Sequence, residues 1–210
     1  MNKVLCLRTC DANRRGHGGF QWPESGPVEA PDWSPEACCG KGLHGLLWGE
    51  GGYAEHLSSR EDAVWMVVAV DANAVVDLQG KVKFPRGEVV YCGTRDGATT
   101  YILANGGAGK ACAYARVTAG YMGTAIAGKR GTAIAGDRGS ATAGYQGTAT
   151  AGDEGTATAG DRGTVCVRWY DTTANRYRLA VGYVGEGEGG IEANVPYRVE
   201  GRGVLVRANK

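Results

Sequence analysis

The sequence predicts a mostly β protein, in which an N-terminal α+β domain precedes a thin, two-sided β-solenoid with a C-terminal strand-rich cap. Three observations support this fold class. Residues 116–163 consist of six consecutive octapeptides, and a fixed period of this kind indicates a stack of coils. Glycine makes up 36 of the 210 residues, more than twice its usual share. Tryptophan and proline occur only outside the repeat, so more conventional structure is expected to flank it.

Residues 1–104 are expected to form the N-terminal α+β domain. Prolines recur every four residues between positions 23 and 35, which excludes a helix and predicts an extended loop anchored by Trp22 and Trp33. The apolar run at 64–70 does not alternate, so it predicts a strand buried on both faces. The remaining expected elements are a short helix or turn at 42–48 and strands at 74–78, 81–84 and 88–92.

Residues 105–168 are assigned to the solenoid, whose octapeptides read approximately T-A-x-A-G-x-x-G. Alternation in T-A-x-A places alanine on one face of a strand and threonine or isoleucine on the other. The glycines are expected to supply positive φ angles in the turns. Eight residues cannot close around a core, so two octapeptides are expected to form each 16-residue coil, giving three coils. A three-sided coil of 24 residues is the alternative, although an all-alanine interior favours the thinner section.

Alanine methyl groups bury too little surface to offset the entropy cost of ordering such an array. Larger structures are therefore expected to cover both of its ends. The N-terminal domain is predicted to cover one end. Residues 169–210, where tyrosines return and alternating strands are predicted at 176–181 and 203–207, are assigned to a C-terminal β cap at the other.

Charge and cysteine content restrict the classes of function and location. A net charge of +1 provides no strong nucleic-acid signal, and the longest apolar run, 64–70, is too short to span a bilayer. The first residues do not resemble a signal peptide, and the seven cysteines lack disulfide-framework spacing, so a cytoplasmic location is expected. Cysteines 92, 112 and 166 are expected to be small buried hydrophobic residues. No cofactor is predicted.

Metal binding is left open for four cysteines near the N-terminus, Cys6, Cys10, Cys38 and Cys39. Their thiols are suitable zinc ligands. Structural zinc sites, however, usually present two separated cysteine pairs, whereas Cys38 and Cys39 are adjacent. No metal ligand is therefore assigned.

Two groups of residues are candidates for binding. In a two-sided coil the variable turn residues alternate between two edges, and their aromatic and cationic members could contact a protein partner. These candidates are Tyr121, Met122, Arg130, Arg138, Tyr145 and Arg162. The alternative is that they are merely polar turns. A second candidate site, in the N-terminal domain, consists of His44, Cys39, Trp48 and Tyr53. There the alternative is a histidine with a structural role.

The chain resembles an uncharacterised family encoded by bacteriophages and prophages. The residues that carry the resemblance are Gly42-Leu-His44, the G-[DKY]-x-G-[TS]-A-x-A units and the tail at 190–199. The array departs from that family in having glycine where its members often have serine. The resemblance implies a short N-terminal domain, an octapeptide array and a strand-rich tail, and it implies no established catalytic residues.

These observations favour a non-enzymatic binding protein that recognises a host or phage macromolecule, with inhibition of a CRISPR-type defence complex as one version. One alternative is an enzyme with a small-substrate or nucleotide site around His44. Another is a structural solenoid that assembles as a homo-oligomer. Ice binding is disfavoured, because each face of the array has three rungs and two of its six outward positions interrupt the T-x-T pattern.

Overall fold

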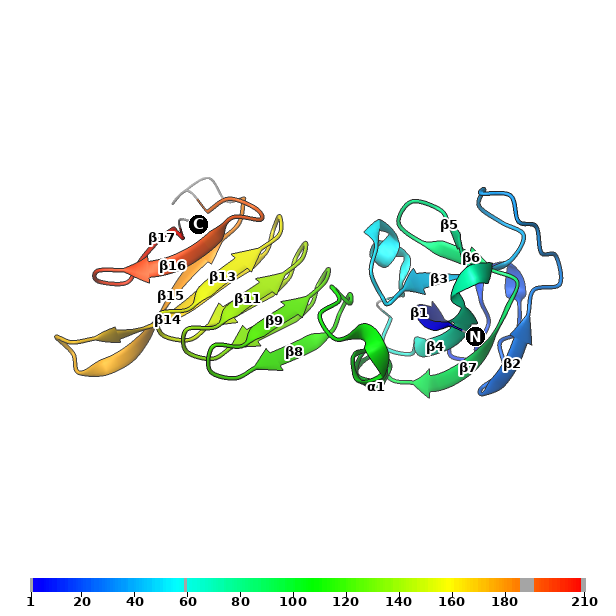
Figure 1. Ribbon diagram of the computed structural model, residues 1–210, viewed down its shortest axis with the longest axis horizontal. Coiled ribbons are helices and arrows are strands. Elements are labelled where there is room, and N and C mark those ends of the chain that lie inside the picture. The colour runs from blue at the N-terminus through cyan, green and yellow to red at the C-terminus, as the bar shows by residue number, and fades with distance from the viewer. Residues whose placement is uncertain (1, 59, 186–190, 209–210) are drawn as a thin grey trace. The chain divides into compact units, whose positions relative to one another are not determined.

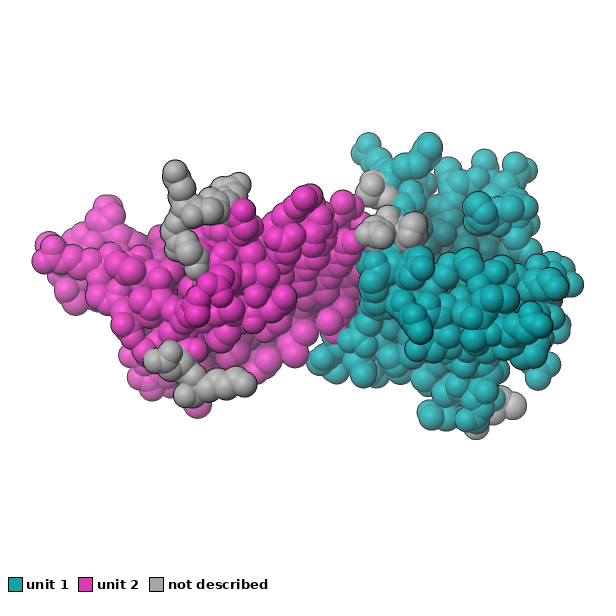
Figure 2. All heavy atoms as spheres, turned by 90° about the horizontal axis from the view of Figure 1, so that it is seen from above, with its two compact units in different colours: residues 1–110 teal, residues 111–210 magenta. Residues whose placement is uncertain are grey.

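The computed structural model describes residues 2–58, 60–185 and 191–208. Figure 1 labels the helices and strands, and Figure 2 colours the two units into which the chain divides, residues 1–110 and 111–210. The second unit contains both the octapeptide array and the C-terminal strands. The expected three domains, 1–104, 105–168 and 169–210, stay a prediction, as does the covering of the array by the N-terminal domain.

The first unit is built on a seven-stranded sheet with the order β2-β7-β4-β1-β3-β6-β5, in which neighbouring strands are antiparallel. Its strands are β1 (Lys3–Cys10), β2 (Gly26–Glu29), β3 (Leu43–Leu47), β4 (Val64–Asp71), β5 (Val76–Asp77), β6 (Val82–Phe84) and β7 (Arg86–Gly93). Its helical segments are η1 (His17–Gly19), η2 (Gly52–His56), η3 (Ala72–Ala74), α1 (Arg95–Ile102) and η4 (Leu103–Gly107).

Strand β4 lies between β1 and β7, and its residues 65–70 are buried, as the non-alternating sequence predicts. The proline-rich segment is largely irregular and is anchored by Trp22, which is 2% exposed. Part of it, however, forms edge strand β2. Proline is compatible with an edge strand, because one side of that strand makes no ladder hydrogen bonds.

The short helix or turn expected at 42–48 is wrong, because residues Leu43–Leu47 form strand β3 between β1 and β6. Gly45 permits this position, since a Cβ there would lie 3.1 Å from the Cβ of Cys6 on β1. Pairing with two neighbouring strands therefore decides the structure of a segment too short for its own periodicity to do so.

The second unit contains two five-stranded sheets that face each other across a thin core. One sheet consists of β8 (Arg116–Ala119), β10 (Thr132–Ala135), β12 (Thr148–Ala151), β14 (Thr164–Asp171) and β15 (Arg176–Tyr183). The other consists of β9 (Thr124–Ala127), β11 (Ser140–Ala143), β13 (Thr156–Ala159), β16 (Pro196–Glu200) and β17 (Val204–Arg207).

The register confirms the two-sided coil. Thr132 pairs with Thr148 and Ser140 with Thr156, in parallel ladders that join residues sixteen positions apart. Consecutive octapeptides thus alternate between the two sheets, and the three-sided alternative of 24 residues per coil is wrong.

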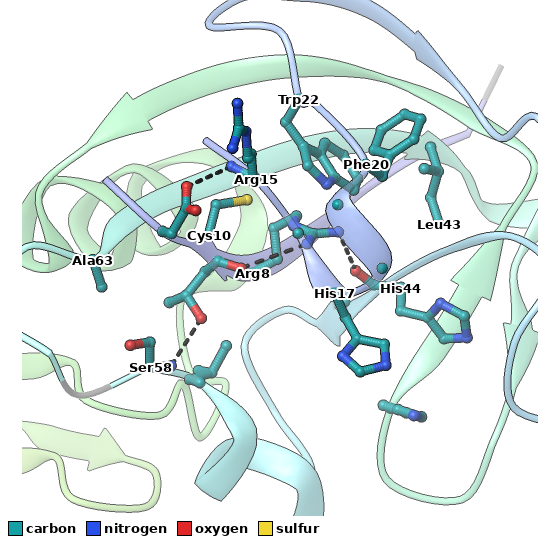
Figure 3. A pocket seen from close by; sticks show the side chains of 18 of the residues that line it. Arg8, Cys10, Arg15, His17, Phe20, Trp22, Leu43, His44, Ser58 and Ala63 are labelled. Atoms are coloured by element: carbon teal, nitrogen blue, oxygen red, sulfur yellow. Dashed lines mark hydrogen bonds between the residues drawn. The ribbon is translucent and has the colours of Figure 1, made fainter. Parts of the chain in front are cut away.

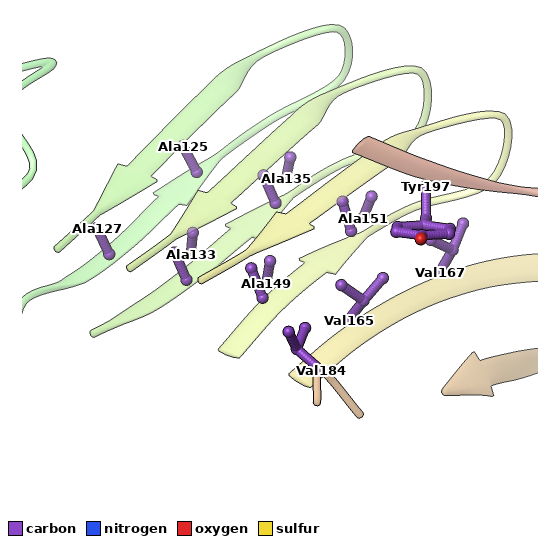
Figure 4. Close-up of a cluster of buried hydrophobic side chains, with 14 residues drawn as sticks. Ala125, Ala127, Ala133, Ala135, Ala149, Ala151, Val165, Val167, Val184 and Tyr197 are labelled. Atoms are coloured by element: carbon purple, nitrogen blue, oxygen red, sulfur yellow. The ribbon is translucent and has the colours of Figure 1, made fainter. Parts of the chain in front are cut away.

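Alanines fill the interior between the two sheets (Figure 4). The ten alanines of β9–β13 are at most 4% exposed. Towards the C-terminus this core continues into larger side chains, Val165, Val167, Val184 and Tyr197. The C-terminal segment therefore supplies the bulk that the alanines lack. Of the cysteines expected to be buried, Cys112 is buried, whereas Cys92 and Cys166 are only half-buried.

The turns of the array differ from the sequence expectation in where the positive φ angles occur. They fall on the second variable residue of each G-x-x-G turn, namely Met122, Arg130, Arg138, Gln146, Glu154 and Arg162, at +54° to +58°. A left-handed conformation is unfavourable for such residues. The N–H of the left-handed residue donates to the next coil, as from Arg130 to the Tyr145 carbonyl at 2.8 Å.

The glycines of these turns are needed because neighbouring coils approach closely. A Cβ on Gly144 would lie 2.8 Å from the carbonyl carbon of Gly128 and 2.8 Å from the nitrogen of Lys129 in the preceding coil. Contacts this short cannot be relieved without moving backbone. A Cβ on Gly120, which begins the first turn of the array on the opposite edge, would meet nothing within 4 Å.

Asp137 links three successive coils through one carboxylate. Its Oδ1 accepts a hydrogen bond from the Asp153 N–H at 2.8 Å and pairs with the Arg168 guanidinium of β14. The Asp153 N–H first, and Arg168 second, lower the pKa of the Asp137 carboxyl against the opposing effect of desolvation.

Replacing Gly144 by alanine is expected to destabilise the array by about 1–3 kcal/mol, because the added methyl group forces the coils apart. Gly120→Ala is the matched control and is expected to change the free energy of unfolding by less than about 0.5 kcal/mol. Chemical denaturation of both variants checks this. Equal destabilisation of the two would contradict the steric role of the glycines.

Acid is expected to weaken the second unit through Asp137. The folded-state pKa of this carboxyl lies below its unfolded value, so its contribution is fully present above the unfolded pKa, about 3.9, and is lost as the pH falls through the folded value. Asp137→Asn should therefore lower the melting temperature at pH 7 and flatten its decline below about pH 4. Asp161→Asn, at another edge turn, serves as the control. An unchanged acid profile in Asp137→Asn would exclude this role.

Candidate functional site

The outer face of β9, β11 and β13 carries a regular set of small side chains. Pairing places Ser140 between Thr124 and Thr156, and Thr142 between Ile126 and Thr158. Successive rungs of a sheet are about 4.8 Å apart, and alternate residues of one strand about 6.6 Å apart. The six side chains therefore form a two-dimensional lattice, which we call the β9–β11–β13 face.

The opposite outer face is less uniform. Across β10, β12 and β14 its outward residues are Thr132, Ile134, Thr148, Thr150, Thr164 and Cys166. Here four of the six side chains carry hydroxyl groups, against five of six on the β9–β11–β13 face. Both faces have the outward positions that the alternation of the octapeptide predicts.

The candidate turn residues gather on two edges of the array. Backbone hydrogen bonds connect Met122 to Asp137 and Arg138 to Asp153 on one edge, and Arg130 to Tyr145 and Gln146 to Asp161 on the other. Tyr121, Met122 and Arg138 therefore share one edge, and Arg130, Tyr145 and Arg162 share the other.

Arginine side chains bridge successive coils along these edges. Arg138 donates to the Tyr121 hydroxyl at 3.2 Å and forms an ion pair with Glu154 at 2.6 Å. On the other edge, Arg162 donates to the Tyr145 hydroxyl at 3.3 Å. Such exposed pairs contribute less than about 1 kcal/mol each. They give the turn residues a role within the array itself.

Tyr121 and Met122 are 64% and 65% exposed, so both are accessible. Their role in contacting a protein partner stays a prediction.

An open cleft of about 1480 Å³ lies in the first unit (Figure 3). Its walls come from β1, β3, the segment between β1 and β2 and residues near η2. Of the predicted N-terminal site, His44, Cys39 and Tyr53 line the cleft. Trp48 is not among its lining residues, and its ring lies beside Gly106, where a Cβ would be 3.1 Å away.

Arg8 of β1 also lines the cleft, and sequence patterns did not single it out. Its guanidinium lies 3.6 Å from the centre of the Trp22 ring, and its Nη1 donates to the His44 carbonyl at 3.2 Å. Burial lowers the pKa of Arg8, because desolvation disfavours the charged form. The one feature of the sequence that could have indicated Arg8 is its position as a charged residue in a strand that also contains buried residues.

His44 and Cys39 do not form the thiolate–imidazole pair that a cysteine nucleophile would require. The Cys39 sulfur instead accepts a hydrogen bond from the Lys81 Nζ at 3.0 Å, which is the main cause lowering its pKa. Desolvation lowers the pKa of His44, and the nearby Lys81 adds to the effect. Within the described residues, the buried Nε2 of His44 has no hydrogen-bond partner.

The four cysteines considered as metal ligands do not come together. Cys6 and Cys10 are buried, with burial raising the pKa of Cys6 to about 12, whereas Cys38 and Cys39 are exposed. Over the part of the chain that the structure describes, no three His, Cys, Asp or Glu side chains are grouped as a metal site would need. Within that same part, none of the helices has the length and apolar character to cross a membrane.

The chain is similar to one protein family and to several bacterial proteins. Residues 4–102 match the family described as "Domain of unknown function (DUF7666)". The chain is 47% identical over 107 residues to an ice nucleation protein of Xanthomonas campestris pv. translucens, covering 50% of this chain and 7% of that protein. It is 45% identical over 104 residues to the ice nucleation protein InaU of Pantoea ananas, covering 49% and 10%.

A similar match is found with an ice nucleation protein of Pseudomonas syringae, 44% identical over 106 residues and covering 50% of this chain and 9% of that protein. The chain thus spans a tenth or less of the length of these relatives. No solved structure matches it.

These relatives correct three expectations. The phage or prophage origin is wrong, because the relatives are bacterial proteins named for ice nucleation. The expected binding of a host or phage macromolecule, with its counter-defence version, is wrong for the same reason, and so is the expectation that ice binding is disfavoured. The cytoplasmic location expected from the N-terminal residues and the cysteine spacing is overturned by the same relatives. Residues 4–102 match the DUF7666 family, and the chain has homologues named ice nucleation protein.

Proposed function

We propose that the octapeptide array binds ice through the β9–β11–β13 face. The observation that carries this proposal is the lattice of hydroxyl-bearing side chains on that face. Five of its six outward residues are hydroxyl-bearing, in ladder register from coil to coil: Thr124, Ser140, Thr142, Thr156 and Thr158.

Ice presents a periodic array of water molecules, so a surface that binds it must offer groups with a matching, rigid repeat. A hydroxyl group both donates and accepts hydrogen bonds, as each water molecule does. Threonine is β-branched and has few rotamers, so little side-chain entropy is lost when it holds ordered water. The parallel ladders beneath these side chains keep the rungs evenly spaced.

The face also has an apolar component, from threonine methyl groups and from Ile126. Charged side chains are absent from the six outward positions, so no strongly hydrated group interrupts the layer of water. The opposite face, with Ile134 and Cys166, has fewer hydroxyl groups and is the weaker candidate.

The names of the relatives, which refer to ice nucleation, support this function. A nucleus of ice must reach a critical size, so the area of an ice-binding face decides how well it nucleates. With about three coils, this array is expected to adsorb to ice and to nucleate it only weakly.

Thr142→Lys tests the proposal at the centre of the face, where Thr142 lies between Ile126 and Thr158. A charged, flexible side chain there should disrupt the ordered water and weaken partition of the protein into growing ice by about tenfold, or ~1.4 kcal/mol. Thr150→Lys makes the same change on the opposite face and should have the smaller effect. Thr172→Lys, in the exposed β14–β15 turn, is the matched control and should partition like the unchanged protein.

Partition into a slowly grown ice hemisphere measures adsorption, and inhibition of ice recrystallisation provides a second readout. Circular dichroism establishes that each variant is folded. Exclusion of the unchanged protein from ice would overturn the proposal. Equal partition of Thr142→Lys and Thr172→Lys would contradict the assignment of ice binding to the β9–β11–β13 face.

A further inference from the structure

The cleft of the first unit gathers positive charge. Arg8 of β1 and Lys81, which precedes β6, line it, and Lys83 lies on β6 directly opposite His44 of β3. All three cations are close enough to His44 to lower the pKa of its imidazole. The fold therefore brings Lys81 and Lys83 near Arg8, although they follow it by 73 and 75 positions in the sequence.

The acidic residues of the cleft do not neutralise this cluster. Asp11 accepts the backbone N–H groups of Asn13 and Arg15. Asp32 accepts the N–H of Gly42, and Asp62 pairs with Arg60 at 2.9 Å. Among the described residues, no ion pair with a carboxylate involves Arg8, Lys81 or Lys83.

Arg8 is held in one orientation. One face of the guanidinium stacks on Trp22, and the two terminal nitrogens donate to the carbonyls of His44 and Thr9 at 3.2 and 3.5 Å. Gly16 allows the chain to pass beside it, because a Cβ there would lie 2.9 Å from the Arg8 Nη2. The two carbonyl oxygens accept hydrogen bonds from Arg8 but do not neutralise its positive charge. Because a guanidinium has five N–H donors, Arg8 can still donate hydrogen bonds to a ligand. Its buried Nε has no hydrogen-bond partner among the described residues.

Lys83 adds a second buried cation. It is 0% exposed, its Nζ lies 5.6 Å from the centre of the Trp33 ring, and within the described residues that nitrogen makes no hydrogen bond. A buried charge without a counterion is costly. An anion that entered the cleft would reduce this cost for Arg8, which lines it.

We propose that the cleft binds a small phosphorylated organic molecule, with the Arg8 guanidinium and the Lys81 ammonium as the groups that receive its phosphate. Arginine matches the geometry of phosphate oxygens, and the cluster of cations favours a dianion over a singly charged carboxylate. The aromatic rings of Phe20, Trp22 and Tyr53, which also line the cleft, supply surface for the organic part. This site is independent of ice binding by the array.

Calorimetric titration of the full chain with inorganic pyrophosphate tests the proposal. Saturable binding with a Kd below about 1 mM is expected. Arg8→Lys retains the charge but loses the planar fork and its stacking, so it should weaken binding at least tenfold. Arg60→Lys makes the same substitution in the same cleft, at a residue that pairs with Asp62, and should bind as the unchanged protein does.

A second measurement needs no substitution. Cys39, held by Lys81, should react more slowly with iodoacetamide when pyrophosphate occupies the site, because the added negative charge disfavours its thiolate. The adjacent Cys38, whose sulfur lies 4.0 Å from the Glu36 carboxylate, is the internal reference. Mass spectrometry of the alkylated peptide follows both thiols.

Five outcomes would overturn the proposal. These are the absence of saturable binding, equal binding by folded Arg8→Lys and Arg60→Lys, and an unchanged Cys39 rate at saturating pyrophosphate. The fourth is an equal effect of sodium sulfate at the same ionic strength, which would indicate screening alone. Tighter binding of citrate than of pyrophosphate would assign the cleft to carboxylates and contradict the phosphate preference.

Discussion

The close approach of successive coils is the constraint on which the second unit depends. Parallel ladders hold each backbone against the residue sixteen positions away, and at Gly144 and its equivalents no space remains for a side chain. This contact accounts for the paired glycines. It also explains how alanine side chains can fill the core, because the two sheets of a thin coil leave little space between them. Ladder hydrogen bonds and the larger buried residues Val165, Val167 and Tyr197 add to the stability of the unit.

The same constraint shapes the two surfaces that the coils present. Within the strands it spaces the outward side chains evenly, so an outward pair such as Ser140 and Thr142 has an equivalent pair on each neighbouring rung. Within the turns it fixes a left-handed residue whose side chain extends along an edge, where arginines such as Arg138 span two coils. Faces suited to ordered water and edges suited to polar contacts thus arise from one backbone geometry.

Much of this fold could be predicted from the sequence, because the eight-residue period and its alternation determine strand, turn, coil and inward face directly. The left-handed position could not, since residues as different as Met122 and Glu154 occupy it and contacts across coils select it. Strand β3 depends on pairing with strands distant in sequence. The cationic cleft is equally non-local, because Arg8, His44 and Lys81 line it together only in the folded chain. Ice binding is disfavoured by the three rungs and the interrupted T-x-T pattern of each face, and relatives named ice nucleation protein overturn that expectation.

Because consecutive octapeptides alternate between the two sheets, the repeating unit of the array is a pair of octapeptides. Inserting sixteen residues would lengthen both faces by one rung and leave everything downstream on its original side. Inserting eight would transfer every later strand, β14 included, to the opposite sheet and exchange the two edges. Such an array can therefore grow only by an even number of octapeptides if the C-terminal strands are to stay on their original sheets. Duplication of an even number of octapeptides enlarges a face without moving those strands to the opposite side.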